Sequence, residues 1–284
     1  MGVCSYIEHV FKPKIARIAV VVNMKTDARK AGGVQRLPEG MQGLAKGMAI
    51  LEAFSPRRTR LTVSEAAEAA ATSRASARRC LLTLTELGYL EFDGKYFRPQ
   101  PRLLALSAVY SGTRSLPQIA EPFLQAARDA LQESISLAVP DGDTALFVAR
   151  VEAERLVSTG ISVGTRVDLY CTATGRVLLS AWDDDRLAAY LDRVKIQART
   201  KWALVKKTAL RDAVQTARTL GYATTDQELE IGLRSIAVPV IDSRGAMVGA
   251  MSASASSARV SMQQVIKGFL PSLRANADAL GRAL

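Results

Sequence analysis

The chain has 284 residues, 48% of them hydrophobic, and is therefore long and apolar enough for two domains with separate cores. No apolar run approaches the roughly 18 residues of a membrane-spanning helix, and the single histidine leaves little room for a histidine-based metal site or general base. The net charge of +11 arises mostly early in the chain, with 7 Lys and Arg against 3 acidic residues in 1–40 and 10 against 6 in 41–103, which indicates nucleic acid as a partner.

Residues 1–40 carry no clear structural pattern. The apolar run 15–22 has basic flanks like those of a signal peptide, but it lacks a small-residue cleavage site and more basic polar sequence follows it. We therefore expect a disordered extension, or a working start at Met24 or Met41. Without a secretory signal, the three widely spaced cysteines indicate a reducing cytoplasm, with no disulfide and no metal site.

The first domain, predicted for residues 41–103, begins with two helices. Apolar side chains recur at helical spacing at Leu44, Met48, Leu51 and Phe54, and Ser55-Pro56 ends this helix. Residues 61–63 can form a short strand. Thr62 and Glu65 then form a capping box, which predicts a short helix over 63–69.

The next helix, predicted over 73–87, has an apolar side and a cationic side. A 3.6-residue period places Ala77, Cys80, Leu81, Leu84 and Leu87 on one stripe, with the arginines opposite. Arginine on an outer helical face is often only solvated or paired with Glu. A capped helix before this one and a hairpin after it favour a recognition helix instead. The predicted DNA contacts in this helix are Ser73, Arg74, Ser76, Arg78 and Arg79.

A hairpin and a linker complete this domain. Residues 89–92 and 95–98 flank Asp93-Gly94, a pair that favours a type I′ turn, so we expect a wing with Lys95 near DNA phosphates. The linker, predicted as a helix over 104–116, carries an apolar stripe that should pack on a partner subunit. Helix, strand, helix, turn, helix and hairpin together predict a winged helix-turn-helix.

The second domain, predicted for residues 117–284, mixes helices with more strands than a helical bundle allows. It is expected to be an α+β domain whose loops enclose a pocket. The expected strands are 135–139, 144–151, 156–163, 222–225, 234–240 and 246–253, and a loop is expected over 164–170. The expected helices are 117–133, 172–181, 184–191, 210–220 and one starting at Ser261.

Five segments in order resemble one family of bacterial transcription factors, the isocitrate-lyase-regulator (IclR) family, and within it the branch that controls protocatechuate and 4-hydroxybenzoate breakdown. The segments are LAKGMAILEAF, LTVSEAAEAAATSRASARRCLLTLTELGYLEFDGKYF, VGTRVDLYCTATGRVLLSA, DQELEIGLRSIAVPV and ARVS. The resemblance implies a winged helix-turn-helix joined by a helix to a GAF-like effector domain. It also implies homodimers or tetramers on palindromic DNA operators and a small organic acid as signal.

The chain departs from the family pattern at two places. Ala71 stands where the family usually has Gly in the helix-helix turn, and a left-handed Ala costs roughly 1 kcal/mol. In the effector half, Asp168, Leu169, Ala173 and Thr174 replace the usual Pro, Ala, Ser and Met, and Ser252 replaces a common Asn. The identity of the acid therefore does not follow from the resemblance.

A carboxylate pocket requires an arginine fork or a helix N-terminus, and this chain offers both. The helix that starts at Thr172 can present free amides, and Arg150, Arg166 and Arg234 lie on or beside predicted strands. Each arginine could instead pair with Glu152, Asp226 or Glu228, and Tyr170 could stack on a ring or fill the core. The predicted ligand contacts are Arg150, Tyr170, Thr172, Ala173, Thr174, Arg234 and Ser252, with Arg234 the first choice for the carboxylate.

Two other functions stay open on the sequence. An enzyme with an accessory DNA-binding domain would need Cys171 as its nucleophile, but a thiol without a histidine partner stays mostly protonated. A second domain that only oligomerises and binds no ligand is also compatible with the pattern. We expect no catalytic residue, cofactor, metal or membrane partner.

Overall fold

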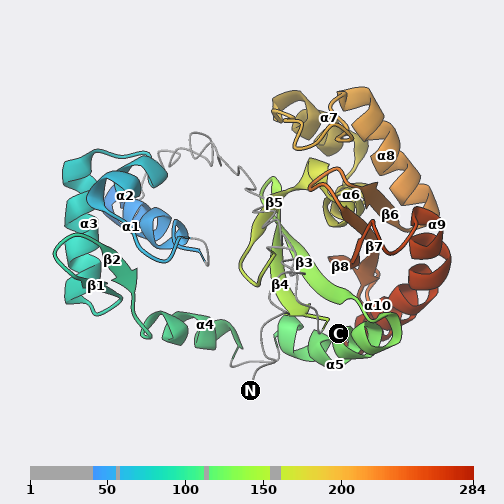
Figure 1. Ribbon diagram of the computed structural model, residues 1–284, viewed down its shortest axis with the longest axis horizontal. Helices are drawn as coiled ribbons and strands as arrows, with labels where there is room; N and C mark the ends of the chain where they lie inside the picture. Colours follow the sequence, from blue (N-terminus) through green and yellow to red (C-terminus); the bar gives the residue numbers. More distant parts are fainter. Residues whose placement is uncertain (1–40, 56–57, 112–114, 154–160) are drawn as a thin grey trace, which may run out of the picture. The chain divides into compact units, whose positions relative to one another are not determined.

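The computed structural model describes residues 41–55, 58–111, 115–153 and 161–284 (Figure 1). The chain divides into two compact units, Met1–Ser107 and Ala108–Leu284. The first holds a helix-turn-helix and a hairpin, and the second an antiparallel sheet with helices, so the predicted α+β fold is confirmed. Residues 1–40, predicted as a disordered extension, lie outside the described residues.

The first unit is a winged helix-turn-helix built on two helix caps. Its elements are α1 (Gln42–Glu52), α2 (Val63–Ala69), α3 (Arg74–Glu86), β1 (Leu90–Phe92) and β2 (Phe97–Pro99). The capping box starts α2: Glu65 accepts the Thr62 amide at 2.7 Å, and the Thr62 hydroxyl accepts the Glu65 amide at 3.3 Å. The Ser73 hydroxyl accepts the Ser76 amide at 3.2 Å and starts α3. The core of this unit contains Ile50, Leu61, Ala66, Ala77, Leu81, Leu90 and Phe97.

Two predicted apolar stripes differ from the structure. In α1, Leu44 and Met48 are 64% and 46% exposed, and the buried residue is Ile50, so the helix packs on the core through a different side from the predicted one. In α3, Leu87 is 49% exposed, since it is the C-cap where the chain leaves the helix. The predicted strand 61–63 is a single bridge from Leu61 to Phe97, because the next residue already caps α2.

The wing turn is shifted by one residue from its predicted position. Asp93 donates its amide to the Tyr96 carbonyl at 3.1 Å, so the two central residues are Gly94 and Lys95. Gly94 has φ of 96°, whereas Lys95 is not among the residues with positive φ, and a type I′ turn requires both. The prediction was wrong because the Asp93 side chain accepts the amides of Lys95 and Tyr96, at 3.0 and 2.7 Å, and fixes the turn one residue later.

The second unit is a sheet of six antiparallel strands, in the order β5-β4-β3-β8-β7-β6, between two helical layers (Figure 1). The strands are β3 (Ser134–Asp141), β4 (Thr144–Val151), β5 (Arg166–Asp168), β6 (Ala223–Asp226), β7 (Leu233–Ile241) and β8 (Met247–Ser256). The helices are α5 (Leu116–Leu131), α6 (Ala173–Ser180), α7 (Asp184–Arg193), α8 (Lys207–Leu220), α9 (Met262–Gln264) and α10 (Leu270–Ala283), and α4 (Leu103–Ser111) precedes them.

The two faces of the sheet carry side chains of different size. The face toward α5 and α10 contributes Ile236, Val238 and Met251 to a core of large side chains. Their neighbours Ala237 and Ala250 point to the opposite face, toward α6, α7 and α8, because side chains alternate along a strand. Small side chains under α6 leave room for that helix and for a cavity beside it.

One predicted strand is absent where the structure describes its residues. Of the predicted strand 156–163, residues 156–160 lie outside the described residues, and 161–163 form no strand. The edge strand is β5, inside the predicted loop 164–170, where Leu146 pairs with Arg166 and Thr144 with Asp168. The pairing of residues 166–168 depends on register with β4, which composition does not reveal.

Replacing Ala71 with Gly should stabilise the first unit. Ala71 has φ of 46°, and glycine removes this left-handed strain of about 1–2 kcal/mol but gains backbone entropy in the unfolded chain. We expect a net gain of roughly 0.5–1 kcal/mol in urea unfolding of this unit. The control Ala75→Gly, at an exposed position inside α3, should lose up to about 1 kcal/mol. If Ala71→Gly lost as much unfolding free energy as Ala75→Gly, the turn at Ala71 would not be strained.

Candidate functional site

The cationic side of α3 is exposed and carries charges without acidic partners. Arg74, Arg78 and Arg79 are exposed, and none of them forms an ion pair with another described residue. Ser73 caps the helix and Ser76 is half-buried in its first turn. The five predicted DNA contacts thus lie together at the N-terminal end of one helix, and the three arginines among them are exposed.

The wing adds a second cationic group. The Lys95 ammonium lies 5.0 Å from the centre of the Tyr96 ring, and the Arg60 guanidinium lies 4.2 Å from the same centre. Hydrogen bonds from the amides of Tyr96 and Lys95 hold the pKa of the Asp93 carboxyl below its usual range, which keeps the turn charged and closed. Sequence reasoning missed Arg60 because it lies outside both helix and hairpin, and only the fold brings it to Tyr96.

A cavity opens in the second unit between the sheet and α6. It contains about 350 Å³ of empty space, counted out to open solvent. Its apolar lining is Phe147, Ile161, Ala173, Leu229 and Leu233, and its hydroxyl lining is Ser136, Thr172, Thr174, Thr225, Ser235, Ser252 and Ser254. The lining, which combines apolar side chains with hydroxyl groups, is of the kind that contacts a small molecule with both an apolar ring and polar substituents.

Strand register explains the row of hydroxyl groups. Thr225 pairs with Ser235, and Ser235 pairs with Ser254, so three neighbouring strands place hydroxyls side by side. Ser252 pairs with Ser136 in a parallel row two residues away, on the same face. Of this set only Ser252 was predicted, because the match depends on which strands are neighbours, and the serines are spread over 120 residues.

The N-terminus of α6 forms one wall of the cavity. The Thr172 hydroxyl caps the helix by accepting the Gly175 amide at 2.9 Å. The amides of Ala173 and Thr174, in the first turn, have no intrahelical acceptor and carry the positive end of the helix dipole. This wall can bind an anion, and all three predicted residues of this segment line the cavity.

Arg150 is one hydrogen bond away from the cavity. Its side chain is 4% exposed, and it donates to the Ser136 hydroxyl at 2.9 Å and to Glu152 at 3.1 Å. Because the Ser136 oxygen accepts this bond, its own proton is available to an acceptor in the cavity. Arg150 therefore affects the cavity through Ser136 and is not itself part of the lining.

The other predicted arginine contacts lie elsewhere. Arg234 binds both oxygens of Asp226, at 2.9 and 3.2 Å, and donates to the carbonyls of Ser257 and Val260. It sits between Leu233 and Ser235, which both line the cavity, so alternation along β7 turns it to the opposite face. Arg166 pairs with Asp141 at 2.6 Å.

Tyr170 is a core residue in the described structure. Its side chain belongs to the buried cluster under α6 and does not line the cavity. Its hydroxyl accepts the Gln197 amide at 3.3 Å, and burial raises its pKa above the usual value. Of the two roles left open for Tyr170, the structure favours packing.

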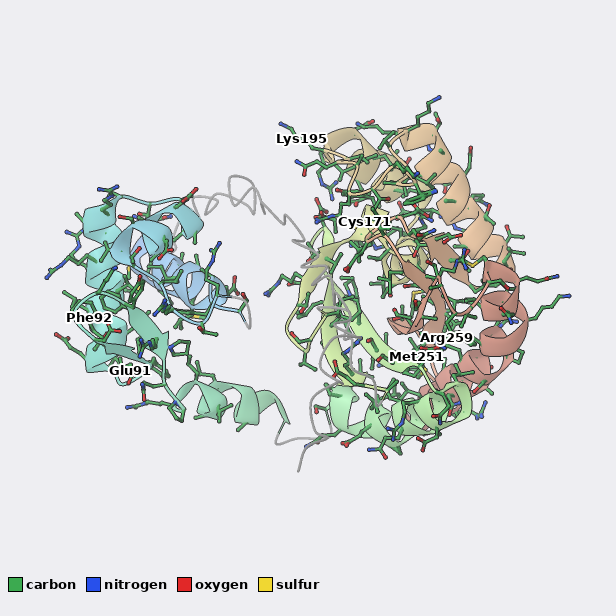
Figure 2. The ribbon with its side chains drawn as sticks, viewed as in Figure 1. Glu91, Phe92, Cys171, Lys195, Met251 and Arg259 are labelled. Carbon is green, nitrogen blue, oxygen red and sulfur yellow. The ribbon has the colours of Figure 1, made fainter. Side chains whose placement is uncertain are left out.

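Cys171 is unsuited to act as a nucleophile (Figure 2). The residue is 3% exposed, its thiol donates to the Asp168 carbonyl at 3.3 Å, and burial raises its pKa to about 12. A thiol with this pKa is almost entirely protonated near neutral pH. Among the described residues, no group of His, Cys, Asp and Glu could hold a metal ion, and no helix is long and apolar enough to cross a membrane.

Comparison with known proteins matches both units to models of one family. The family model for the bacterial transcriptional regulator IclR C-terminal domain matches residues 109–282, and that for the IclR helix-turn-helix domain matches 43–94. The Pca regulon regulatory protein of Pseudomonas putida is 40% identical over 239 residues, which are 84% of this chain and 82% of that protein.

Two further relatives have names that mention aromatic acids. The p-hydroxybenzoate hydroxylase transcriptional activator of Acinetobacter baylyi is 33% identical over 250 residues, covering 86% of this chain and 92% of that protein. The solved inducer-binding domain of the PobR transcription factor from Acinetobacter, a double mutant in complex with 3-hydroxybenzoic acid, is 27% identical with a TM-score of 0.57. It covers 59% of this chain and 98% of that one.

Replacing Gly175 with Ala should displace the α6 wall. A Cβ at Gly175 would overlap the Leu169 carbonyl oxygen, so helix and turn must separate. We expect a loss of about 1–3 kcal/mol in unfolding free energy of the second unit, the usual cost of overpacking. The control is Gly268→Ala, where a Cβ has open space and stability should hold or rise. Equal stability of the two variants would show that the close contact is absent.

Proposed function

Because the chain belongs to the IclR family of bacterial transcriptional regulators, we propose that it binds a palindromic DNA operator as a homo-oligomer. Its occupancy of that operator changes when a small aromatic or keto acid binds its second unit. The observation that carries the proposal is the pairing of two features in one chain. One is a capped helix with three exposed arginines that form no ion pair with another described residue, and the other is a hydroxyl-lined cavity at a helix N-terminus.

The DNA part of the proposal rests on charge and geometry. Arginine can form two parallel hydrogen bonds with guanine in the major groove, and the N-terminal half of α3 presents Arg74, Arg78 and Arg79 for such contacts. Lys95 in the wing and Arg60, which lies against the wing residue Tyr96, are suited to phosphates, which fix position but carry no sequence information. Since its partner is the bacterial chromosome, the protein acts in the cytoplasm.

The effector part rests on the composition of the cavity. A carboxylate fits the amides of Ala173 and Thr174, with the Ser136 proton and the buried cation of Arg150 nearby. An aromatic ring fits against Phe147 and the leucines, and ring hydroxyls fit the serine and threonine row. Relatives named for p-hydroxybenzoate hydroxylase activation and for a 3-hydroxybenzoic acid complex support genes of aromatic catabolism as targets.

Association into a dimer or tetramer follows from symmetry and from exposed apolar surface. A palindromic site needs two recognition helices, and each chain has one α3. Met41, the N-cap of α1, is 77% exposed, and Leu44 and Met48 on α1 are 64% and 46% exposed. On α4, Leu104 and Leu106 are 70% and 48% exposed. Surfaces of this kind are costly in water unless another subunit covers them.

The structure bears on the two alternative functions left open by the sequence. The enzyme alternative loses its only candidate nucleophile, because the Cys171 thiol is buried and protonated. The other alternative is a second unit that only oligomerises, and the cavity beside α6 is the observation against it.

Replacing Arg78 with Ala should weaken specific operator binding by about 1–3 kcal/mol per half-site if it contacts a guanine. Lys95→Ala should weaken all DNA sequences alike and lower the salt slope by about one unit. Gel-shift titrations at several salt concentrations measure both, with light scattering to report the oligomer. Arg211→Ala, an exposed arginine on α8, is the control. Unchanged operator affinity in the Arg78 variant would remove that residue from the interface.

Isothermal titration with protocatechuate, 4-hydroxybenzoate, 3-hydroxybenzoate and β-ketoadipate tests the effector. At least one acid should release heat on binding. Ser136→Ala should make the binding free energy of that acid less favourable by about 1–2 kcal/mol, because one hydrogen bond to a charged group is lost. Ser134→Ala, two residues earlier on β3 and outside the lining, is the matched control. Heat from none of the four acids would favour the second unit that binds no ligand.

A further inference from the structure

The connection between β6 and β7 forms the wall of the cavity that faces α6. Leu229 in this loop lines the cavity, and Thr225 and Leu233 on either side of the loop line it too. The loop starts at Gln227 with φ of 59° and ends at Gly232 with φ of 87°. A positive φ at a residue other than glycine is a strained conformation, which persists only where surrounding contacts hold it.

The loop is closed by its own hydrogen bonds and by a neighbouring segment. The Gln227 amide donates to the Leu233 carbonyl at 2.7 Å, and the Gly232 amide donates to the Gln227 side chain at 3.1 Å. The Thr200 hydroxyl donates to the Gln227 carbonyl at 2.6 Å. The same hydroxyl also lies 3.3 Å from the Glu228 carbonyl, and the Leu233 amide donates to the Glu230 carbonyl at 3.2 Å. These bonds hold the backbone of the loop, from which the Leu229 side chain enters the cavity.

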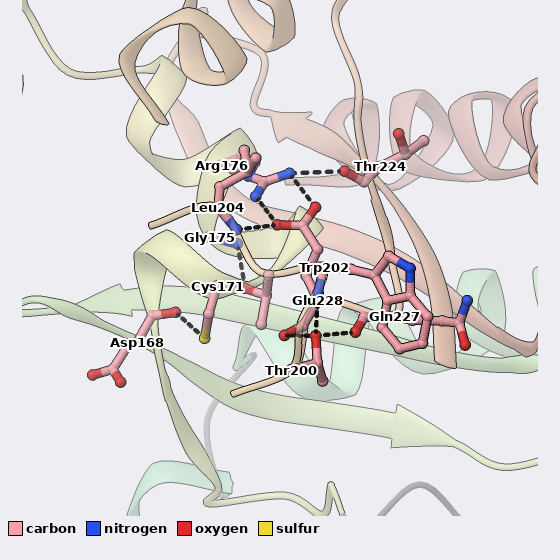
Figure 3. Close-up of polar contacts among 11 residues, drawn as sticks. Asp168, Cys171, Gly175, Arg176, Thr200, Trp202, Leu204, Thr224, Gln227 and Glu228 are labelled. Atoms are coloured by element: carbon pink, nitrogen blue, oxygen red, sulfur yellow. Dashed lines mark hydrogen bonds and ion pairs between the residues drawn. The ribbon is translucent and has the colours of Figure 1, made fainter. Parts of the chain in front are cut away.

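One buried ion pair holds the middle of the loop (Figure 3). Glu228 accepts two hydrogen bonds from Arg176, at 2.9 and 2.5 Å, and a third from the Leu204 amide at 3.3 Å. Arg176 also donates to the Thr224 carbonyl at 3.1 Å. The side chains of Arg176 and Glu228 are 5% and 11% exposed, so water screens their attraction little.

The same pair is anchored on the opposite wall of the cavity. Arg176 belongs to the first turns of α6, directly after Gly175 and close to the amides of Ala173 and Thr174. The ion pair therefore links the wall that carries the helix amides to the wall that carries Leu229. Neither Arg176 nor Glu228 lines the cavity itself.

We propose that Arg176 and Glu228 are positioning residues for the effector: their ion pair sets the distance between Leu229 and the N-terminus of α6, and so sets how tightly an aromatic carboxylate is held. This inference rests on the proposed function of the cavity. The pair acts through Leu229, which packs on the ring while the α6 amides bind the carboxylate.

A purely structural role for the pair predicts a different result. Breaking a buried ion pair destabilises a fold wherever it lies, because one charge is left unpaired. Such a loss lowers the melting temperature, but it predicts no coupling between Glu228 and Leu229 in effector affinity. A positioning role predicts that the effects of Glu228 and Leu229 on effector affinity are not additive, because each variant removes the same contact with the ring.

The test is a double-mutant cycle of effector affinity on the full chain. Isothermal titration with 4-hydroxybenzoate and protocatechuate is run on wild type, Glu228→Gln, Leu229→Ala and the double variant, with a melting curve for each. We expect either single variant to raise Kd about tenfold, and the double variant to be little weaker than the singles. The control Arg259→Gln breaks another partly buried pair, with Glu133 at 2.6 Å, and should lower the melting temperature but leave Kd unchanged.

The outcomes separate this inference from the proposed function. No heat from wild type with any of the four acids overturns the proposed effector site. Three results would overturn the positioning role alone while wild type still binds. They are an unchanged Kd in Glu228→Gln, additive effects on Kd in the double variant, and a loss of affinity in Arg259→Gln equal to that in Glu228→Gln. If Glu228→Gln does not fold, Arg176→Lys takes its place in the cycle, and affinity equal to wild type then overturns the inference.

Discussion

The close approach of α6 to the turn before it determines how the second unit is built. Gly175 lies against the Leu169 carbonyl with no space for a side chain, and the sheet face beneath carries Ala237 and Ala250. This contact points the helix N-terminus along the sheet and leaves an opening lined by hydroxyl groups. A larger residue at any of these positions would lift the helix and change the cavity, so packing and ligand chemistry depend on the same small side chains.

The sequence predicted those features of the fold that depend on short-range chemistry. Capping by Thr62 and Ser73 needs only residues three apart, and both caps are present. Predictions were wrong more often where a feature depends on residues distant in the sequence or on side-chain hydrogen bonds. The wing turn moved because the Asp93 side chain accepts two backbone amides, and Leu44 is exposed because no described part of the first unit covers that side of α1.

The candidate effector site was partly predictable for the same reason. The amides at Thr172 to Thr174 follow from a helix start, which is local. The two hydroxyl rows, one with Ser235 and Ser254 and the other with Ser136 and Ser252, follow from strand order and register, which the sequence does not reveal. Arg234 was assigned to the ligand because of its charge, but a residue between two cavity-lining neighbours on a strand must point to the other face.

The two units use arginine in opposite ways, and under the proposed function this difference would let one chain bind two kinds of anion. On α3 the arginines have no acidic partners among the described residues, so their charge is available to a polyanion. In the second unit, Arg150, Arg176 and Arg234 are each paired with a carboxylate. A small acid there meets helix amides and hydroxyl groups in place of free cations. Such a site binds one carboxylate through directional hydrogen bonds rather than through net positive charge. Because its arginines are already paired, it attracts a polyanion such as DNA only weakly.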